Sequence, residues 1–134
     1  MRRFLLIFTA LLLSACVGPV PKIPAELVGI WANEGAVLHE GKWLMSGQAL
    51  YLGIDGNGAV VGGPPPIGVK ISATFDTTKN TLSIDLIERE KVVKSLLATY
   101  DPNGRTINIG TSKSEFLTRR SEVFDSSVKK GLGL

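Results

Sequence analysis

The chain has 134 residues, which suits one domain, and it carries 15 basic and 12 acidic side chains for a formal net charge of +3. Its single Cys excludes an internal disulfide, and its single His excludes any site that needs two imidazoles from this chain. The 44% apolar content is sufficient for a packed core and argues against a disordered chain.

The first 15 residues have the three parts of a secretory signal. A basic start, Met1-Arg2-Arg3, is followed by an apolar run over residues 4–13 and then by the small residues Ser14 and Ala15. As a helix this run would span about 15 Å, roughly half of the hydrocarbon core, so we do not expect a transmembrane anchor. Removal of residues 1–15 would leave 13 basic and 12 acidic side chains. That balance provides no concentrated basic face, and we therefore expect no nucleic-acid partner.

The sequence Leu13-Ser14-Ala15-Cys16 resembles the lipobox of bacterial lipoproteins. The resemblance implies cleavage between Ala15 and Cys16, and a diacylglycerol and an N-acyl chain on Cys16. In that class an Asp after the Cys retains the protein in the inner membrane, whereas this chain has Val17. The resemblance therefore implies a lipid-anchored protein of the outer membrane that faces the periplasm. The alternative is an ordinary secreted protein in which the Cys occurs by chance.

Residues 16–25 contain three prolines and are predicted to be an extended tether between lipid and domain. Residues 26–121 have the alternation and turn signals of a β-meander, with turns at Asp55-Gly56-Asn57-Gly58 and Asp101-Pro102-Asn103-Gly104. The expected strands are 27–33, 48–54, 59–62, 67–75, 81–88, 92–100, 105–109 and 115–120, with a small hairpin at 36–39 and 42–45.

This spacing is typical of an all-β barrel or sandwich, and the consecutive tight turns favour an up-and-down antiparallel barrel of about eight strands. Closure of the barrel would remove the exposed sheet edges that a meander otherwise leaves.

Residues 122–134 are predicted to form a short C-terminal helix and tail. Phe124, Val128 and Leu132 recur at a spacing of four, which places them on one stripe of a helix. Acidic residues near its start and lysines near its end suit the helix dipole. We expect this helix to pack on the barrel wall or across one mouth.

The first strand contains Gly29-Ile30-Trp31, which resembles the GxW motif of the lipocalin and calycin barrels. The resemblance implies that Trp31 closes the barrel base and stacks on an Arg of the last strand, a contact worth about 0.5–2 kcal/mol. Alternation from Leu117 favours Arg119 for this role, and alternation from Phe116 favours Arg120. We take Arg119, and we interpret Gly29, Trp31 and Arg119 as a structural plug.

Three other features are candidate contacts for a ligand or a partner. Trp43 lies among glycines and is interpreted as a loop residue over a barrel mouth, or as a ligand lid or partner contact. Tyr51 is either a core or rim residue or a contact. Pro64, Pro65 and Pro66 favour a polyproline II segment, which is either a stiff connection or a docking loop.

The sequence shows no constellation for catalysis or metal binding. His39 and Glu40 are adjacent, so on a strand they would point to opposite faces. The loop at residues 55–58 lacks the bidentate Glu of a calcium site, and a hairpin turn explains it. Asp85 alternates outward, as a solvated carboxylate would. We expect no enzymatic activity, no metal and no cofactor beyond the lipid on Cys16.

The leading hypothesis is a lipid-anchored envelope protein whose barrel is a non-catalytic binding or interaction module. Its partners are then the membrane, through the lipid anchor, and either a small apolar ligand or another envelope protein. The alternative is an inhibitor of a secreted protease or lysozyme, although such inhibitors usually carry a disulfide. An open apolar interior would favour ligand binding, and a filled interior would favour surface interactions.

Overall fold

The structure is a computed structural model that describes residues 22–39, 42–45, 47–63, 67–110 and 116–120. Its elements are a 3-10 turn, η1 (Ala25–Leu27), and the strands β1 (Gly29–Ala32), β2 (Ala36–His39), β3 (Lys42–Met45), β4 (Gln48–Leu52), β5 (Asn57–Gly62), β6 (Ile67–Asp76), β7 (Thr81–Glu88), β8 (Lys91–Asp101), β9 (Thr106–Asn108) and β10 (Phe116–Arg119).

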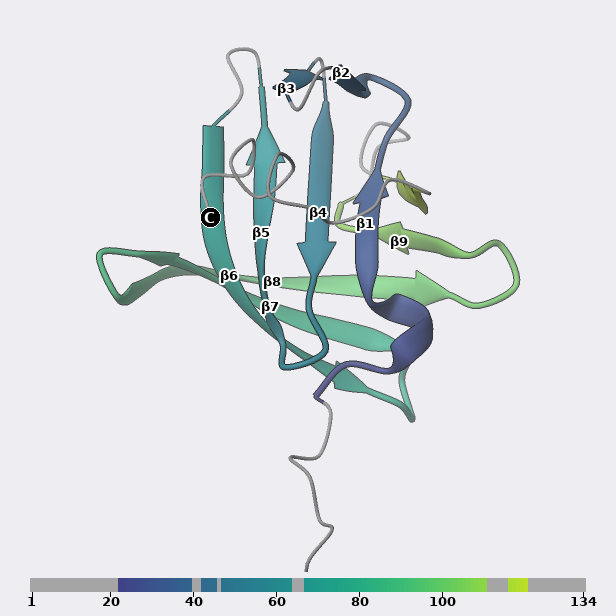
Figure 1. The fold of residues 1–134 in the computed structure, drawn as a ribbon. Coiled ribbons are helices and arrows are strands. Elements are labelled where there is room, and N and C mark those ends of the chain that lie inside the picture. The colour runs from purple at the N-terminus through teal and green to yellow at the C-terminus, as the bar shows by residue number, and fades with distance from the viewer. Residues whose placement is uncertain (1–21, 40–41, 46, 64–66, 111–115, 121–134) are drawn as a thin grey trace, which may run out of the picture.

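Eight of these strands form a closed antiparallel barrel in the order β1-β10-β9-β8-β7-β6-β5-β4 (Figure 1). Each barrel strand from β4 to β9 pairs with the next one in the chain, and β1 closes the sheet by pairing with both β4 and β10. The predicted up-and-down barrel is therefore confirmed. The hairpin β2–β3 forms a separate sheet, with the bounds expected from the sequence.

The predicted C-terminal helix at 122–134 lies outside the described residues. Within the ranges that the structure describes, no helix has the length and apolar character needed to cross a membrane.

Aspartate side chains stabilise several of the turns that the sequence predicts. In three hairpin turns the Oδ1 of an Asp accepts a hydrogen bond from the backbone amide two residues later. This bond stabilises the turn in addition to the hydrogen bonds between the paired strands. The pairs are Asp55 with Asn57, Asp76 with Thr78 and Asp101 with Asn103, each at 2.9 Å.

The barrel begins earlier in the sequence than the boundary expected at residue 26. Ile23 is already fully buried in the core, and its amide donates to the carbonyl oxygen of Ile54 at 3.3 Å. The first strand starts at Gly29 rather than at residue 27. The reason is that the Leu27 amide donates to the carbonyl of Pro24 at 2.9 Å, which closes η1 and turns the buried Leu27 into the core.

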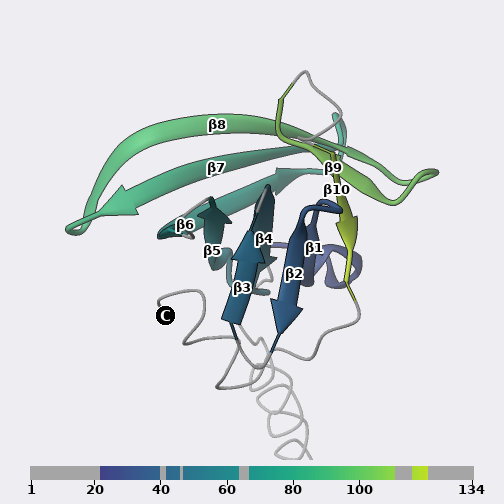
Figure 2. The same ribbon diagram turned by 90° about the horizontal axis from the view of Figure 1, so that it is seen from above.

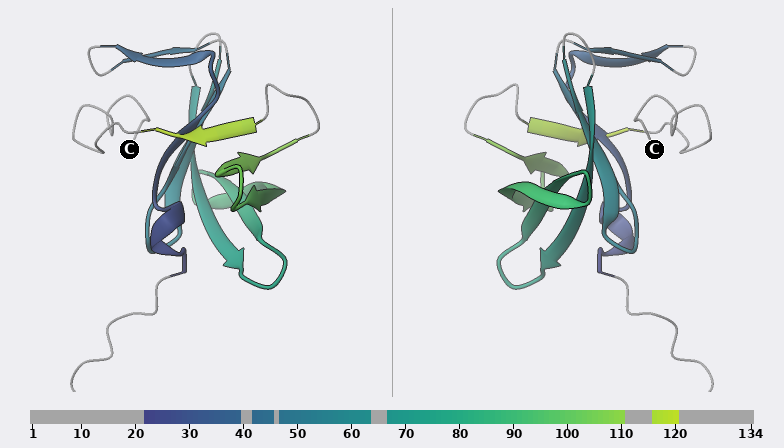
Figure 3. Two further views of the ribbon diagram at one scale, coloured as in Figure 1. Left: turned by 90° about the vertical axis from the view of Figure 1, so that its right-hand side faces the viewer. Right: turned by 90° about the vertical axis from the view of Figure 1, so that its left-hand side faces the viewer.

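We call the end of the barrel next to η1 the base (Figure 3), and buried side chains fill the interior there. The buried members of this cluster are contributed by η1, by the segment before it and by most of the barrel strands, so that one core joins both ends of the described chain. They are Ile23, Leu27, Trp31, Leu50, Leu52, Ile71, Ala73, Leu82, Ile84, Ala98, Ile107 and Leu117.

A second buried cluster lies on the outer face of β1, β4 and β5. Side chains alternate between the two faces of a strand, so the neighbours of the inward Trp31 and Leu50 point away from the barrel interior. This cluster consists of Ile30, Ala32, Ala36, Ala49, Ala59 and Val61, with Tyr51 packed against it.

The hairpin β7–β8 projects from the barrel well beyond the neighbouring β6 (Figure 2). Its register shifts between Leu86 and Ile87, because Leu86 lies opposite Lys94 and Ile87 lies opposite Val92. Val93 is thus an extra residue, a β-bulge on β8. At the tip, Arg89 and Glu90 both have positive φ, 49° and 63°.

Two consecutive positive φ values define a turn that prefers Asn-Gly. Replacing Arg89-Glu90 by Asn-Gly should therefore raise the free energy of unfolding by about 1–2 kcal/mol, since each ordinary side chain in the left-handed region costs about that much. Urea unfolding measures the change. Thr78→Gly is the matched control, because Thr78 itself does not have positive φ, although Asn80 in the same turn does. There Gly should lower stability, and a gain at both turns would contradict the conformational explanation.

Candidate functional site

The base of the barrel is organised around Trp31 on β1. The indole is 1% exposed, and its Nε1 donates to the carbonyl oxygen of Leu27 at 2.9 Å. The ring of Tyr100 from β8 meets the indole edge-on, with centroids 6.1 Å apart and an interplanar angle of 81°. Phe75 from β6 makes a similar contact with Tyr100 at 6.3 Å. The indole therefore joins η1 to the opposite wall of the barrel.

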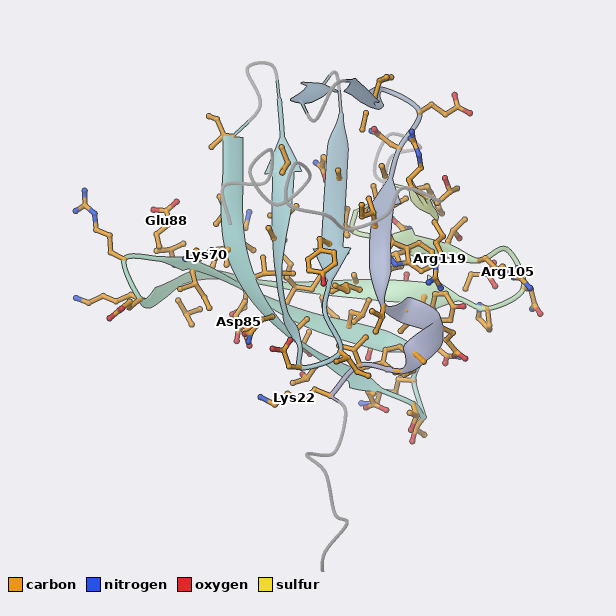
Figure 4. The ribbon with its side chains drawn as sticks, viewed as in Figure 1. Lys22, Lys70, Asp85, Glu88, Arg105 and Arg119 are labelled. Atoms are coloured by element: carbon orange, nitrogen blue, oxygen red, sulfur yellow. The ribbon has the colours of Figure 1, made fainter. Side chains whose placement is uncertain are left out.

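Arg119 occupies the position on β10 directly opposite Trp31 (Figure 4). Its Nη1 donates to the carbonyl oxygen of Glu26 at 2.6 Å, and its Nη2 donates to that of Val28 at 2.7 Å. Gly29 has a φ of 132°, and a Cβ there would lie 3.5 Å from Nη2. The glycine both permits this backbone conformation and leaves room for the guanidinium. The last strand is thereby fastened to the residues that precede the first strand.

The structure thus distinguishes the two arginines that the sequence left as alternatives. Arg119 lies across from Trp31, whereas the Nη1 of Arg120 donates to the carbonyl oxygen of Ala36 at 3.0 Å. The interactions shown for Arg119 are hydrogen bonds to main-chain carbonyls, and the ring in contact with the indole is that of Tyr100. In effect, Arg119 anchors the base through the backbone of η1 and its neighbours.

Arg119→Met should lower the free energy of unfolding by about 1.5 kcal/mol. This is the low end of the range for hydrogen bonds to charged groups, which we choose because the Arg119 side chain is exposed. Arg105→Met, in the exposed turn between β8 and β9, is the control and should change stability by less than about 0.5 kcal/mol. Equal effects of the two substitutions in urea unfolding would show that the base does not depend on Arg119.

The inner face of the barrel becomes progressively more exposed away from the base. On β5 to β8, the inward-facing residues that lie farthest from the base are apolar but incompletely buried. The most exposed of them, Ile67, is 64% exposed. We call this set the mouth row; it comprises Val60, Ile67, Val69, Leu86 and Leu96. None of them is among the contacts predicted from the sequence, although inward alternation carried past the core would have identified them.

The two candidate contacts that the structure describes, Trp43 and Tyr51, lie in different sheets. Trp43 lies on β3 opposite Leu38 of β2, in the hairpin at the end of the barrel away from η1 (Figure 1). Tyr51 is half-buried on the outer face of β4. Burial, with a smaller contribution from the charge of Asp55, raises the pKa of the Tyr51 phenol, so it is neutral at physiological pH. Cys16, Pro64, Pro65 and Pro66 lie outside the described residues.

Carboxylates in the described part of the chain serve turns and surface hydrogen bonds. Asp55 accepts from both the amide and the side chain of Asn57, and these bonds lower the pKa of its carboxyl group. Asp85 accepts from the hydroxyl of Ser95 at 2.6 Å on the outer face of the β7–β8 hairpin. The described residues contain no group of three or more His, Cys, Asp or Glu side chains that could hold a metal ion.

No protein-family model, curated protein or solved structure significantly matches this chain. The class of the protein therefore rests on the fold itself. The described residues form a small closed antiparallel β-barrel of the up-and-down, lipocalin-like kind, with a packed base held by Trp31 and Arg119.

Proposed function

We propose that this chain is a lipid-anchored bacterial envelope protein and that its barrel is a non-catalytic binding module. The anchor is proposed from the lipobox-like sequence ending at Cys16. The module binds either a small apolar ligand or another envelope protein through the end of the barrel that carries the mouth row.

The entry point of the chain supports an orientation for this module. The amides of Lys22 and Ile23 donate to the carbonyl oxygen of Ile54, so the chain joins the barrel at its base. Six residue steps separate Cys16 from Lys22, so the chain between these two residues can span at most about 20 Å. A lipid on Cys16 would therefore keep the base close to the membrane and leave the mouth row facing away from it.

The observation that carries the proposal is the contrast between the two ends of the interior. The base is filled by buried side chains, so a ligand there would have to displace the core. The mouth row instead presents partly exposed aliphatic side chains, and Lys94 lies opposite Leu86 beside it. Such a surface suits an apolar ligand or an apolar protein contact.

Neighbouring residues of β6 allow a matched test, because Val69 faces the interior and Lys70 faces outward. We expect the chain to bind the neutral dye Nile red saturably, with a blue-shifted emission. Val69→Glu should weaken this binding by about tenfold, which corresponds to about 1.4 kcal/mol. Lys70→Glu should leave it unchanged. Equal loss in both variants, or no saturable binding by the parent chain, would remove the apolar-ligand form of the proposal.

A further inference from the structure

Strand β8 is paired along most of its length on one side but only at one end on the other. It pairs with β7 over residues 91–99, whereas β9 pairs only with Thr99, Tyr100 and Asp101. Residues 91–98 consequently have no strand on their second side within the described part of the chain. Closure of the barrel therefore does not remove every sheet edge, because β9 is three residues long and β8 is eleven.

The main-chain groups of this edge point outward in a defined pattern. The Tyr100 amide donates to the carbonyl oxygen of Asn80, on the β7 side of the strand. N–H and C=O groups alternate between the two sides of an antiparallel strand, so those of Leu97 and Ser95 point to the open side. These are the groups with which another strand would pair.

The side chains of the edge are unusually apolar for an unpaired strand. Val92 and Leu97 are 58% and 67% exposed, and Val93 is exposed as well. Proteins usually protect an edge with lysines or a bulge, and Lys91, Lys94 and the bulge at Val93 do so in the first half only. An exposed edge with this composition is a template for a further strand.

The edge is complementary to a second copy of itself. Because Val93 is the extra residue of the bulge, the eight residues 91–98 occupy seven strand positions, with Ser95 at the centre. An antiparallel copy centred on Ser95 covers residues 91–98 and stops before Thr99, which is the first residue of β8 paired with β9. The opposed positions are Lys91 with Ala98, Val92 with Leu97, Lys94 with Leu96, and Ser95 with Ser95.

This register satisfies the requirements of a stable strand pair. Each pair has both side chains on the same face of the sheet, as Val92 and Leu97 share the outer face. The two most exposed apolar side chains of the edge cover each other, and no lysine faces a lysine. The Leu97 and Ser95 main-chain groups that point outward are those that would exchange hydrogen bonds.

We propose that two copies of this chain associate through antiparallel pairing of their β8 edges, with residues 91–98 as the interface and Ser95 at the two-fold axis. The β6–β7–β8 sheets of both copies then form one continuous sheet. This inference goes beyond the proposed function and does not depend on the lipid anchor, and Leu96 belongs both to this interface and to the mouth row.

Sedimentation equilibrium of the chain from residue 16 onward tests this, with Cys16→Ser present to exclude a disulfide or an acyl chain. We expect the mass to rise from one chain to two with concentration. Ser95→Pro should raise the dissociation constant by about tenfold or more. Its monomer should stay folded, because that amide faces the open side. Leu97→Lys should act similarly, and Ile54→Lys, an exposed apolar site away from β8, should have no effect.

A cross-link provides a positive test of the register. Directly opposed hydrogen-bonded residues have Cα atoms about 5.5 Å apart, which is within the range of a disulfide. In the Cys16→Ser chain, Ser95→Cys should form a covalent dimer on mild oxidation, and Ser83→Cys, exposed on β7, should not. The proposal is overturned by a monomer at every concentration, by a dimer that Ser95→Pro and Leu97→Lys leave intact, or by equal cross-linking at both positions.

Discussion

Trp31→Ala should lower the free energy of unfolding by about 3–5 kcal/mol, the range for removing a large buried aromatic side chain. The indole is the largest fully buried side chain of the barrel, and it contacts Tyr100 and donates to Leu27. Removal of the indole would leave a cavity in the base, and the carbonyl oxygen of Leu27 in η1 would lose its hydrogen bond from the indole. A typical domain is stable by only about 5–15 kcal/mol, so the loss is a large part of the total.

Urea unfolding followed by far-ultraviolet circular dichroism measures this loss. Trp31→Phe separates the contributions, since it keeps most of the packing and removes the bond to the Leu27 carbonyl. It should cost less than Trp31→Ala. Ile54→Ala, at an exposed position, should change stability by less than about 0.5 kcal/mol. A loss below about 1 kcal/mol for Trp31→Ala would mean that the indole does not support the base.

Cys16→Ser should abolish acylation of the chain completely. A Ser at this position has no thiol to form the thioether with diacylglycerol, so neither the lipid nor the cleavage that depends on it should follow. Metabolic labelling with a palmitate analogue, followed by gel analysis, measures incorporation and shows the larger, unprocessed form. Val17→Ser leaves the sequence Leu13 to Cys16 intact and should retain the label. Labelling that persists in Cys16→Ser would refute the anchor.

The strands and turns follow from local rules and could be predicted residue by residue. The alternation of β6 and β7 separates apolar from polar faces, and aspartates mark the turns that their side chains hold. The hairpin β2–β3 has the expected bounds for the same reason. Such patterns involve residues close together in the chain, so the sequence contains the whole signal.

The segment before the first strand shows where local reasoning fails. Ile23 lies among prolines and reads as part of an extended tether, but it is buried in the core through contacts with distant strands. Arg119 is a related case. Its alternation with Leu117 indicated the correct face, and only the fold shows that its partners are the carbonyls of Glu26 and Val28, more than ninety residues earlier.

The sequence by itself determined the class of fold, the position of nearly every strand and the choice of Gly29 and Trp31 for the first strand. These depend on side-chain alternation and turn chemistry, which act over a few residues. The tertiary structure decided that the base is filled, that apolar side chains are exposed at the mouth row, and that residues 91–98 of β8 have no second neighbour among the described strands. Those properties depend on how far each strand extends past the next, and strand length and stagger are fixed only when the sheet closes.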